Sequence, residues 1–226
     1  MKRFFSVLRP IAASCIVIAM GLSVAACGDK PATTGSAGSA GISGGGSQEM
    51  TLSPQNSKFI NTDVTGLGYP RDFALTDHNG KPRTLADFKG KVVVVFFGYT
   101  QCPDVCPTTM AELSSVMKEL GPLADKVQVL FVTVDPERDT QALLAQYVPA
   151  FDPRFLGLYG DLAATEKVAK EFRVFYQKVP GKTSGSYTMD HTAGSYVFDP
   201  EGHIRLFVRN GQGPDPIAHD LKMLLS

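Results

Sequence analysis

The segment KVVVVFFGYTQCPDVCPTTM, residues 91 to 110, is the strongest indication of the fold. Its first half is a continuous run of β-branched and aromatic residues, which is typical of a strand buried on both faces of a parallel sheet. Its second half opens a helix, because apolar residues recur at helical spacing after Pro107, which suits a first turn, and Gly121 ends the pattern. A central strand, a loop and a helix therefore follow one another, and Cys102 and Cys106 fall at the loop.

The rest of the chain continues the alternation of strands and helices. VQVLFVTV, residues 127 to 134, repeats the buried-strand pattern, and a loop and a helix that we expect Asp139 to cap follow it. The other expected elements are a strand at 73–77, one helical turn at 84–88, a strand or connection at 155–160, a helix at 161–172, a hairpin at 194–208 and a last helix at 216–225. This order predicts an α/β fold, a thioredoxin-like sandwich with a central mixed sheet flanked by helices and with a C-terminal β-hairpin and helix.

Composition limits the class of protein. The chain has 226 residues, of which 43% are hydrophobic, and this is enough for one domain with an ordinary packed core. Lysine and arginine number 22, and so do aspartate and glutamate, so the totals indicate neither a basic nucleic-acid footprint nor an acidic surface. We therefore expect no nucleic-acid partner.

Residues 1–27 have the features of a lipoprotein signal segment. A basic start is followed by an apolar stretch and then by small residues ahead of Cys27. The sequence VAAC at 24–27 resembles the lipobox of bacterial lipoproteins, in which the chain is cut before the cysteine and that cysteine is acylated. An uncleaved signal anchor is the alternative, because the apolar stretch is just long enough to span a bilayer. Both interpretations place the remainder in the periplasm or another extracytoplasmic space, on a membrane tether.

Residues 28–55 are rich in glycine, serine and alanine and have almost no large apolar side chains. Such a segment cannot offset the entropy cost of ordering a fold, so we expect a flexible linker. A tract of about 23 residues of this composition has a root-mean-square reach of roughly 25–30 Å. The predicted folded domain is then residues 56–226.

The cysteines are informative once the signal segment is set aside. Cys15 lies inside that segment and Cys27 is the expected lipidation site, which leaves Cys102 and Cys106 as the thiols of the mature domain. A purely structural disulfide is disfavoured, because a bridge that closes so short a loop restrains the unfolded chain little. A redox couple and a metal clamp both stay open on spacing alone. A helix start at Cys106 would favour the thiolate and lower the thiol pKa.

Three separated motifs resemble one known family. They are FFGYTQCPDVCPTTMAEL at 96–113, VTVDPERDT at 132–140 and MDHTAGSYVFDPEG at 189–202. Together they resemble the Sco/SenC family of copper-binding, thioredoxin-like proteins that assist cytochrome c oxidase assembly, and the likeness spans roughly residues 65 to 225. The resemblance implies that Cys102, Cys106 and His191 are the copper ligands.

The chemistry of the donors agrees with this implication. Two soft thiolates and an imidazole suit Cu(I), whereas structural zinc normally takes four protein ligands. Asp135, Glu137 and Asp139 are candidates to supply an oxygen to Cu(II). We expect them instead to cap a helix and to hydrogen-bond within their own loop.

The histidines are assigned by position. His191 precedes the predicted hairpin, and in thioredoxin-like topology this approach faces the cysteine loop. We expect His78, His203 and His219 to be solvated in a turn, in the hairpin and on the last helix. Asp190 is a candidate to orient the His191 ring, as carboxylates often do at metal sites, with an exposed loop carboxylate as the alternative.

Two functions fit this pattern. The first is a membrane-tethered copper metallochaperone that delivers copper to the CuA centre of cytochrome c oxidase during assembly, with the subunit carrying that centre as its partner. The alternative is a thiol–disulfide oxidoreductase that uses Cys102 and Cys106 as a redox-active pair on cysteines of that subunit or of other exported proteins. We favour copper, because the C-x3-C spacing differs from the C-x-x-C of dedicated oxidoreductases and simple dithiol exchange has no use for His191.

Such a cycle also needs an upstream copper donor and a thiol reductant as partners. A peroxidase with the same fold is disfavoured. Thr100 lies two positions before Cys102, where Thr-x-x-Cys is usual, and no arginine is close in the sequence.

Overall fold

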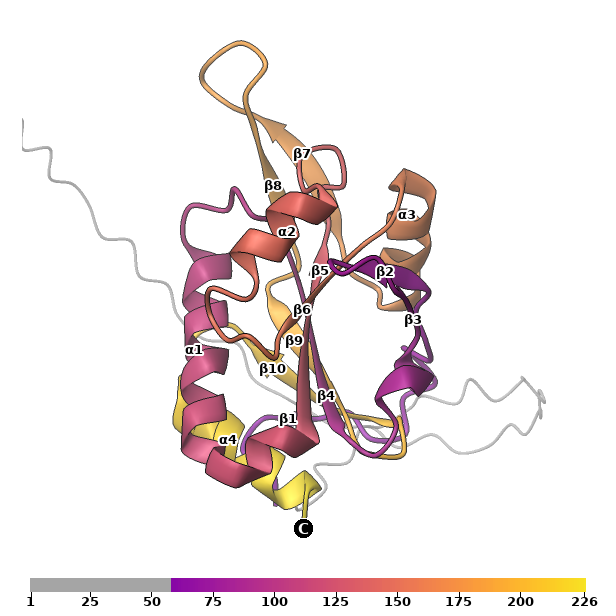
Figure 1. Cartoon of the computed structure of the whole chain (residues 1–226), viewed down its shortest axis with the longest axis vertical. Coiled ribbons are helices and arrows are strands. Elements are labelled where there is room, and N and C mark those ends of the chain that lie inside the picture. Colours follow the sequence, from indigo (N-terminus) through magenta and orange to yellow (C-terminus); the bar gives the residue numbers. More distant parts are fainter. Residues whose placement is uncertain (1–57) are drawn as a thin grey trace, which may run out of the picture. The chain divides into compact units, whose positions relative to one another are not determined.

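The computed structural model describes residues 58–226. In this range a mixed sheet has the strand order β1-β10-β9-β4-β5-β6-β2-β3, and β7 pairs with β8 in a separate two-stranded sheet (Figure 1). Strands β4, β5 and β6 are parallel, and the outer strands are antiparallel to their neighbours. The strands are β1 Thr62–Asp63, β2 Leu75–Asp77, β3 Pro82–Arg83, β4 Val92–Gly98, β5 Val127–Thr133, β6 Leu156–Tyr159, β7 Tyr176–Pro180, β8 Tyr187–His191, β9 Gly194–Phe198 and β10 Ile204–Arg209.

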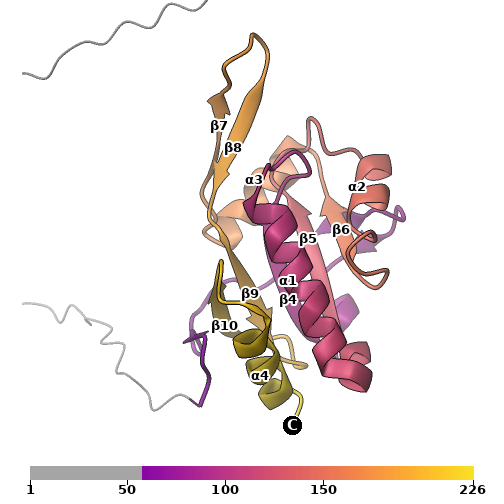
Figure 2. The same cartoon turned by 90° about the vertical axis from the view of Figure 1, so that its left-hand side faces the viewer.

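The helices lie on both faces of the main sheet. They are α1 Val105–Leu120, α2 Gln141–Tyr147, α3 Leu162–Glu171 and α4 Pro214–Leu224, with short 3-10 helices at Leu85–Phe88 and Gly121–Lys126. Figure 2 shows α1 and α4 in front of the sheet and α3 behind it. The predicted thioredoxin-like sandwich, with its C-terminal hairpin and helix, is therefore confirmed. None of the helices formed by residues 58–226 combines the length and the apolar character needed to cross a membrane.

The core explains why the two apolar runs form central strands. Every residue of β4 and β5 is buried, as the continuous apolar pattern predicted. Because side chains alternate along a strand, neighbouring phenylalanines of β4 serve opposite faces. Phe96 packs against Phe131 with ring centroids 6.1 Å apart, and Phe97 packs against Phe172 at 5.1 Å. Each face of the sheet thus has its own aromatic cluster.

Strands β7 and β8 form a ribbon that extends beyond the main sheet (Figures 1 and 2). The sequence did not predict it, since residues 176–191 mix exposed polar and half-buried positions and carry Pro180. The pairing runs from Tyr176 with His191 to Pro180 with Tyr187. His191 is therefore the last residue of a strand, where the sequence had suggested an approach loop.

Two helix starts differ from the prediction. The cap of α2 is Thr140, whose Oγ1 accepts a hydrogen bond from the Leu143 amide at 3.2 Å, and the prediction of Asp139 was wrong. Helix α4 begins at Pro214 rather than at residue 216. The start of α3 is as expected, because Asp161 accepts from the Ala164 amide at 2.7 Å.

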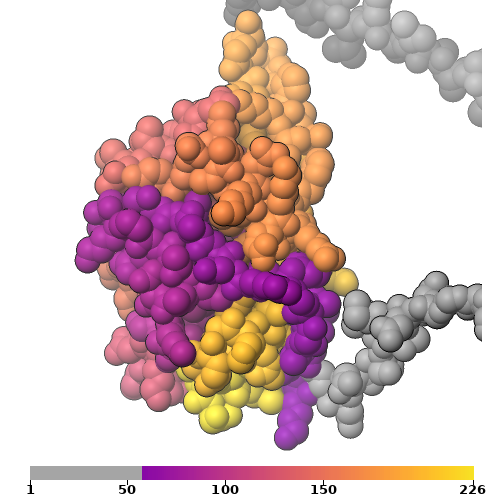
Figure 3. Space-filling view, turned by 90° about the vertical axis from the view of Figure 1, so that its right-hand side faces the viewer, coloured from indigo at the N-terminus to yellow at the C-terminus, as the bar shows by residue number. Residues whose placement is uncertain are grey.

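The first described residues are fixed to the end of the chain. Strand β1 pairs with β10, and the buried carboxylate of Asp220 on α4 accepts hydrogen bonds from the amides of Ile60 and Asn61. In Figure 3 this indigo segment runs beside the yellow and orange surface of the C-terminal part of the fold. The predicted signal segment 1–27 with its Cys27, the whole of the predicted linker 28–55, and residues 56 and 57 of the predicted domain lie outside the described residues.

Candidate metal centre

The two cysteines lie where β4 passes into α1. Cys102 is in the loop after the strand, and Cys106 is the second residue of the helix. The Cys106 amide donates to the Cys102 sulfur at 3.4 Å, so the first turn of the helix places the two sulfur-bearing residues together. Both cysteines are free, Cys102 half-buried and Cys106 buried.

Gly98, the last residue of β4, makes room for one of these sulfurs. A Cβ atom at this position would lie 3.0 Å from Cys106 Sγ and 2.9 Å from the Phe131 ring. Only glycine therefore lets the sulfur rest against the end of the strand. Gly98 is absent from the residues expected at the site, although a glycine that ends a buried strand can mark a close approach.

Replacing Gly98 by alanine should lower the free energy of unfolding by about 1–3 kcal/mol, the usual cost of an extra methyl in a packed core. Urea denaturation of the metal-free protein measures this change in the free energy of unfolding. Gly68→Ala is the matched control, because a Cβ there meets nothing within 4 Å and the backbone is not in the left-handed region. Equal stability of the two variants would show that the sulfur and the ring give way without cost.

His191 completes a cluster of three donors. Its Nε2 lies 3.6 Å from Cys106 Sγ, and its ring meets the rings of Tyr99 and Phe96 edge-on, with centroids 6.0 and 6.4 Å away. One donor atom from each of Cys102, Cys106 and His191 lies within 4.8 Å of the other two. No other such group of histidine, cysteine or carboxylate donors occurs in the range 58–226.

The hydrogen bond on the far side of the ring sets its tautomer. His191 Nδ1 is 3.1 Å from the carbonyl oxygen of Thr192, which can only accept, so the proton is on Nδ1 and Nε2 faces the sulfurs with its lone pair. Asp190 is exposed, and the contact that orients the ring comes from Thr192. Of the two alternatives for Asp190, the structure shows the exposed carboxylate, which lies in β8 and not in a loop.

Burial controls the ionisation of the cluster. It raises the pKa of the Cys106 thiol, and it lowers the pKa of the His191 imidazole. The expected fall of the Cys106 pKa at a helix start was therefore wrong, because desolvation of a fully buried sulfur outweighs the helix terminus. Near neutral pH the metal-free site holds a neutral thiol and a neutral imidazole, and a cation that binds Cys106 must displace its proton.

The carboxylates of the second motif are occupied by hydrogen bonds. Asp139 is buried and accepts from the Thr100 amide at 3.0 Å and from Thr133 Oγ1 at 2.7 Å. The bond from Thr100 fixes the backbone two residues before Cys102. Asp135 accepts from the Tyr187 hydroxyl at 2.8 Å, and Glu137 pairs with Lys178 at 2.5 Å. The expected bonding within the loop is found for Asp135, which also accepts from Arg138 Nε, whereas the other contacts named here reach segments outside the loop. None of the three carboxylates belongs to the donor cluster.

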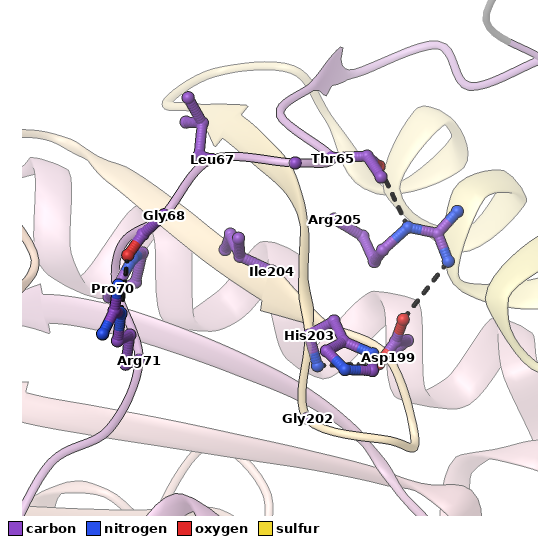
Figure 4. Close-up of a pocket in the computed structure, with 11 residues that line it drawn as sticks. Thr65, Leu67, Gly68, Pro70, Arg71, Asp199, Gly202, His203, Ile204 and Arg205 are labelled. Carbon is purple, nitrogen blue, oxygen red and sulfur yellow. Dashed lines mark hydrogen bonds and ion pairs between the residues drawn. The ribbon is translucent and has the colours of Figure 1, made fainter.

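The other histidines lie elsewhere. His78 is buried, where solvation had been expected, because its Nδ1 accepts from the Gly157 amide at 3.0 Å. The side chain of His203 is 75% exposed and lies beside Asp199 in a cleft of about 590 Å³ at the turn between β9 and β10 (Figure 4). His219 contacts Asp220 on α4. Of the four histidines, His191 is the one that the fold brings to the sulfurs.

Comparison with known proteins gives relatives for most of the described domain. A family model described as SCO1/SenC matches residues 66–226. The chain is 38% identical over 177 residues to the Protein SCO2 homolog, mitochondrial, of Bos taurus, which covers 77% of this chain and 65% of the bovine protein. The chain thus spans slightly less than two thirds of the length of that relative.

Solved structures agree with this match. The structure of Bradyrhizobium japonicum ScoI with copper bound is 48% identical, with a TM-score of 0.63, over 68% of this chain and 98% of that one. The solution structure of apo Sco1 from Thermus thermophilus is 42% identical, with a TM-score of 0.65, over 74% of this chain and 99% of that one. Since the family model also covers all three motifs and all three clustered donors, the chain belongs to the SCO1/SenC family.

Proposed function

We propose that this protein binds copper through Cys102, Cys106 and His191 and delivers it to the CuA centre of cytochrome c oxidase during assembly. The observation that carries the proposal is the convergence of two sulfurs and one imidazole nitrogen within 4.8 Å. Soft thiolates with an imidazole suit Cu(I), and the set lacks the fourth ligand that a structural zinc site normally takes. The copper-bound ScoI, which is 48% identical to this chain, supports the same cargo.

The uneven burial of the donors favours delivery over permanent storage. Cys106 is buried, whereas Cys102 and His191 are only partly buried. A partner can therefore approach the ion from the side of these two donors and replace them one at a time. A closed four-ligand cage would leave no such approach.

The sequence supports a membrane-bound setting for this exchange. We propose that residues 1–27 are a lipoprotein signal segment, that Cys27 carries lipid and that residues 28–55 link it to the domain at 56–226. A linker reach of roughly 25–30 Å lets the domain meet a membrane-embedded oxidase subunit without leaving the membrane surface.

Thiol–disulfide exchange is the second candidate, and one observation favours it. The partly exposed Cys102 lies next to the buried Cys106, so one sulfur is available to attack a partner disulfide and the other to resolve the mixed disulfide. In this reaction the partner gains two thiols, and Cys102 and Cys106 become a disulfide. The raised pKa of the Cys106 thiol counts against this reaction, because Cys106 must attack the mixed disulfide and a protonated thiol is a poor nucleophile.

A paired assay separates the two functions. The Cu(I)-loaded protein and the metal-free dithiol protein are each mixed with the oxidase subunit that carries the CuA site, in reduced and disulfide form respectively. We expect copper to move to the reduced subunit in the first mixture, measured by metal analysis of the separated proteins. Disulfide reduction in the second mixture without copper transfer in the first would contradict delivery and establish the reductase.

A further inference from the structure

Arg138 contacts both parts of the chain that carry the donors. It lies in the loop between β5 and α2, and its Nη1 donates to the side chain of Gln101 at 3.1 Å and to the carbonyl of Tyr187 at 2.9 Å. Its guanidinium also stacks on the Tyr187 ring, 3.6 Å from the centroid, and its Nε donates to the carboxylate of Asp135. The side chain is only 19% exposed, so these contacts are largely removed from solvent.

The contacted residues adjoin the donors. Gln101 directly precedes Cys102, and Tyr187 begins β8, the strand that ends at His191. The guanidinium is also 5.6 Å from the centroid of Tyr99, the ring against which the His191 imidazole packs edge-on. One side chain therefore contacts the loop that carries Cys102, the strand β8 that carries His191, and the Tyr99 ring beside the imidazole.

The histidine strand needs such a contact because of its place in the fold. Strand β8 pairs with β7 and has no partner in the main sheet. The backbone ladder that fixes β4 and the cysteine loop to the core therefore does not fix His191 to them. The ribbon continues into β9 after His191, and Met189 of β8 is buried in the core. The loop between β5 and α2 adds three side chains that bond to the ribbon. They are Arg138, Asp135, which accepts from Tyr187, and Glu137, which pairs with Lys178.

We propose that Arg138 is a positioning residue for copper binding, which holds the His191 imidazole over Cys106 by joining the cysteine loop to the β7–β8 ribbon. This inference rests on the proposed copper function. The planar guanidinium suits the task, since it stacks on one ring while its separate N–H groups reach three acceptors, and a lysine ammonium cannot do both.

Replacing Arg138 by glutamine should weaken Cu(I) binding by about 10- to 100-fold, the usual range for partners that orient a metal ligand. Competition with a chromophoric Cu(I) chelator measures the affinity of the full chain. Arg154→Gln is the matched control, because Arg154 is likewise held by a nearby aspartate, Asp152, with no contact to the cluster, and we expect a change below about twofold. An Arg138→Gln affinity that matches the control would overturn the proposal.

A double-mutant cycle tests whether the effect passes through the imidazole. In a His191→Ala background the Arg138→Gln change should cost less than about twofold, because there is no ring left to position. An undiminished loss in that background would contradict the proposal. If His191→Ala alone leaves the affinity unchanged, the proposed ligand set fails, and the positioning role fails with it.

A metal-free measurement and a milder variant complete the test. Arg138→Gln should speed amide hydrogen exchange at residues 187–191 while leaving exchange in α4 unchanged. If residues 187–191 exchange at the same rate as in the parent protein, Arg138 does not fix the ribbon to the cysteine loop. Arg138→Lys keeps the positive charge beside Asp135, and its fold is checked by circular dichroism. We expect it to bind Cu(I) about tenfold more weakly than the parent, and full affinity would show that charge alone is sufficient.

Discussion

Oxidation of Cys102 and Cys106 to a disulfide should abolish tight Cu(I) binding. Both soft donors of the three-donor cluster are lost together, since a disulfide offers no thiolate, and His191 alone remains. Four-ligand structural zinc sites bind with about 10–16 kcal/mol, which is roughly 3 kcal/mol per ligand. Loss of two donors then predicts an affinity lower by roughly 10,000-fold.

The measurement compares oxidised and re-reduced protein in competition with a chromophoric Cu(I) chelator. The substitutions Cys15→Ser and Cys27→Ser leave Cys102 and Cys106 as the thiols under test. Restoration of binding by a dithiol reductant, removed before metal is added, shows that the loss is due to the disulfide and not to damage. Comparable affinity of the two forms would exclude the sulfurs as ligands.

His191→Ala should weaken Cu(I) binding by roughly 100-fold, the cost of one donor on the same scale. The fold should be retained, because the ring lies at the end of a two-stranded ribbon outside the main sheet. The substitution removes the contact of Nε2 with Cys106 Sγ at 3.6 Å and the edge-on contacts of the ring with Tyr99 and Phe96. Metal affinity should therefore fall by more than the free energy of unfolding does.

His203→Ala is the matched control for this variant. His203 is exposed at the turn between β9 and β10 and is not in the donor cluster. We expect its Cu(I) affinity to equal that of the parent. An equal effect of the two substitutions, or an unchanged affinity for His191→Ala, would reject the imidazole as a ligand.

The protonation state of Cys106 bears on the choice between copper delivery and thiol–disulfide exchange. Because burial raises the pKa of this thiol, the metal-free protein keeps it protonated and poorly nucleophilic. Copper binding drives the proton off, since a metal ligand must be a thiolate. The same burial that hinders thiol exchange leaves metal binding possible, and this asymmetry favours a copper carrier.

The order of the main elements and the place of the cysteine pair follow from the amino-acid sequence. Residues 92–98 and 127–133 form the buried strands that their continuous apolar runs predicted, and α1 begins beside Cys106 as its helical spacing indicated. These features depend on local periodicity, which is a property of neighbouring residues. The position of His191 before the predicted hairpin and the resemblance carried by three motifs together selected it among the four histidines.

The contacts between segments that are distant in the sequence depend on the folded chain. His191 and Cys106 are 85 positions apart, and their contact depends on the β7–β8 ribbon, whose mixed polar pattern predicts no strand. The need for Gly98 and the bridge made by Arg138 arise from close approach of segments that are remote in sequence. The Cys106 pKa was predicted in the wrong direction for the same physical reason. A helix terminus can be read from neighbouring residues, whereas desolvation depends on everything the fold packs around the sulfur.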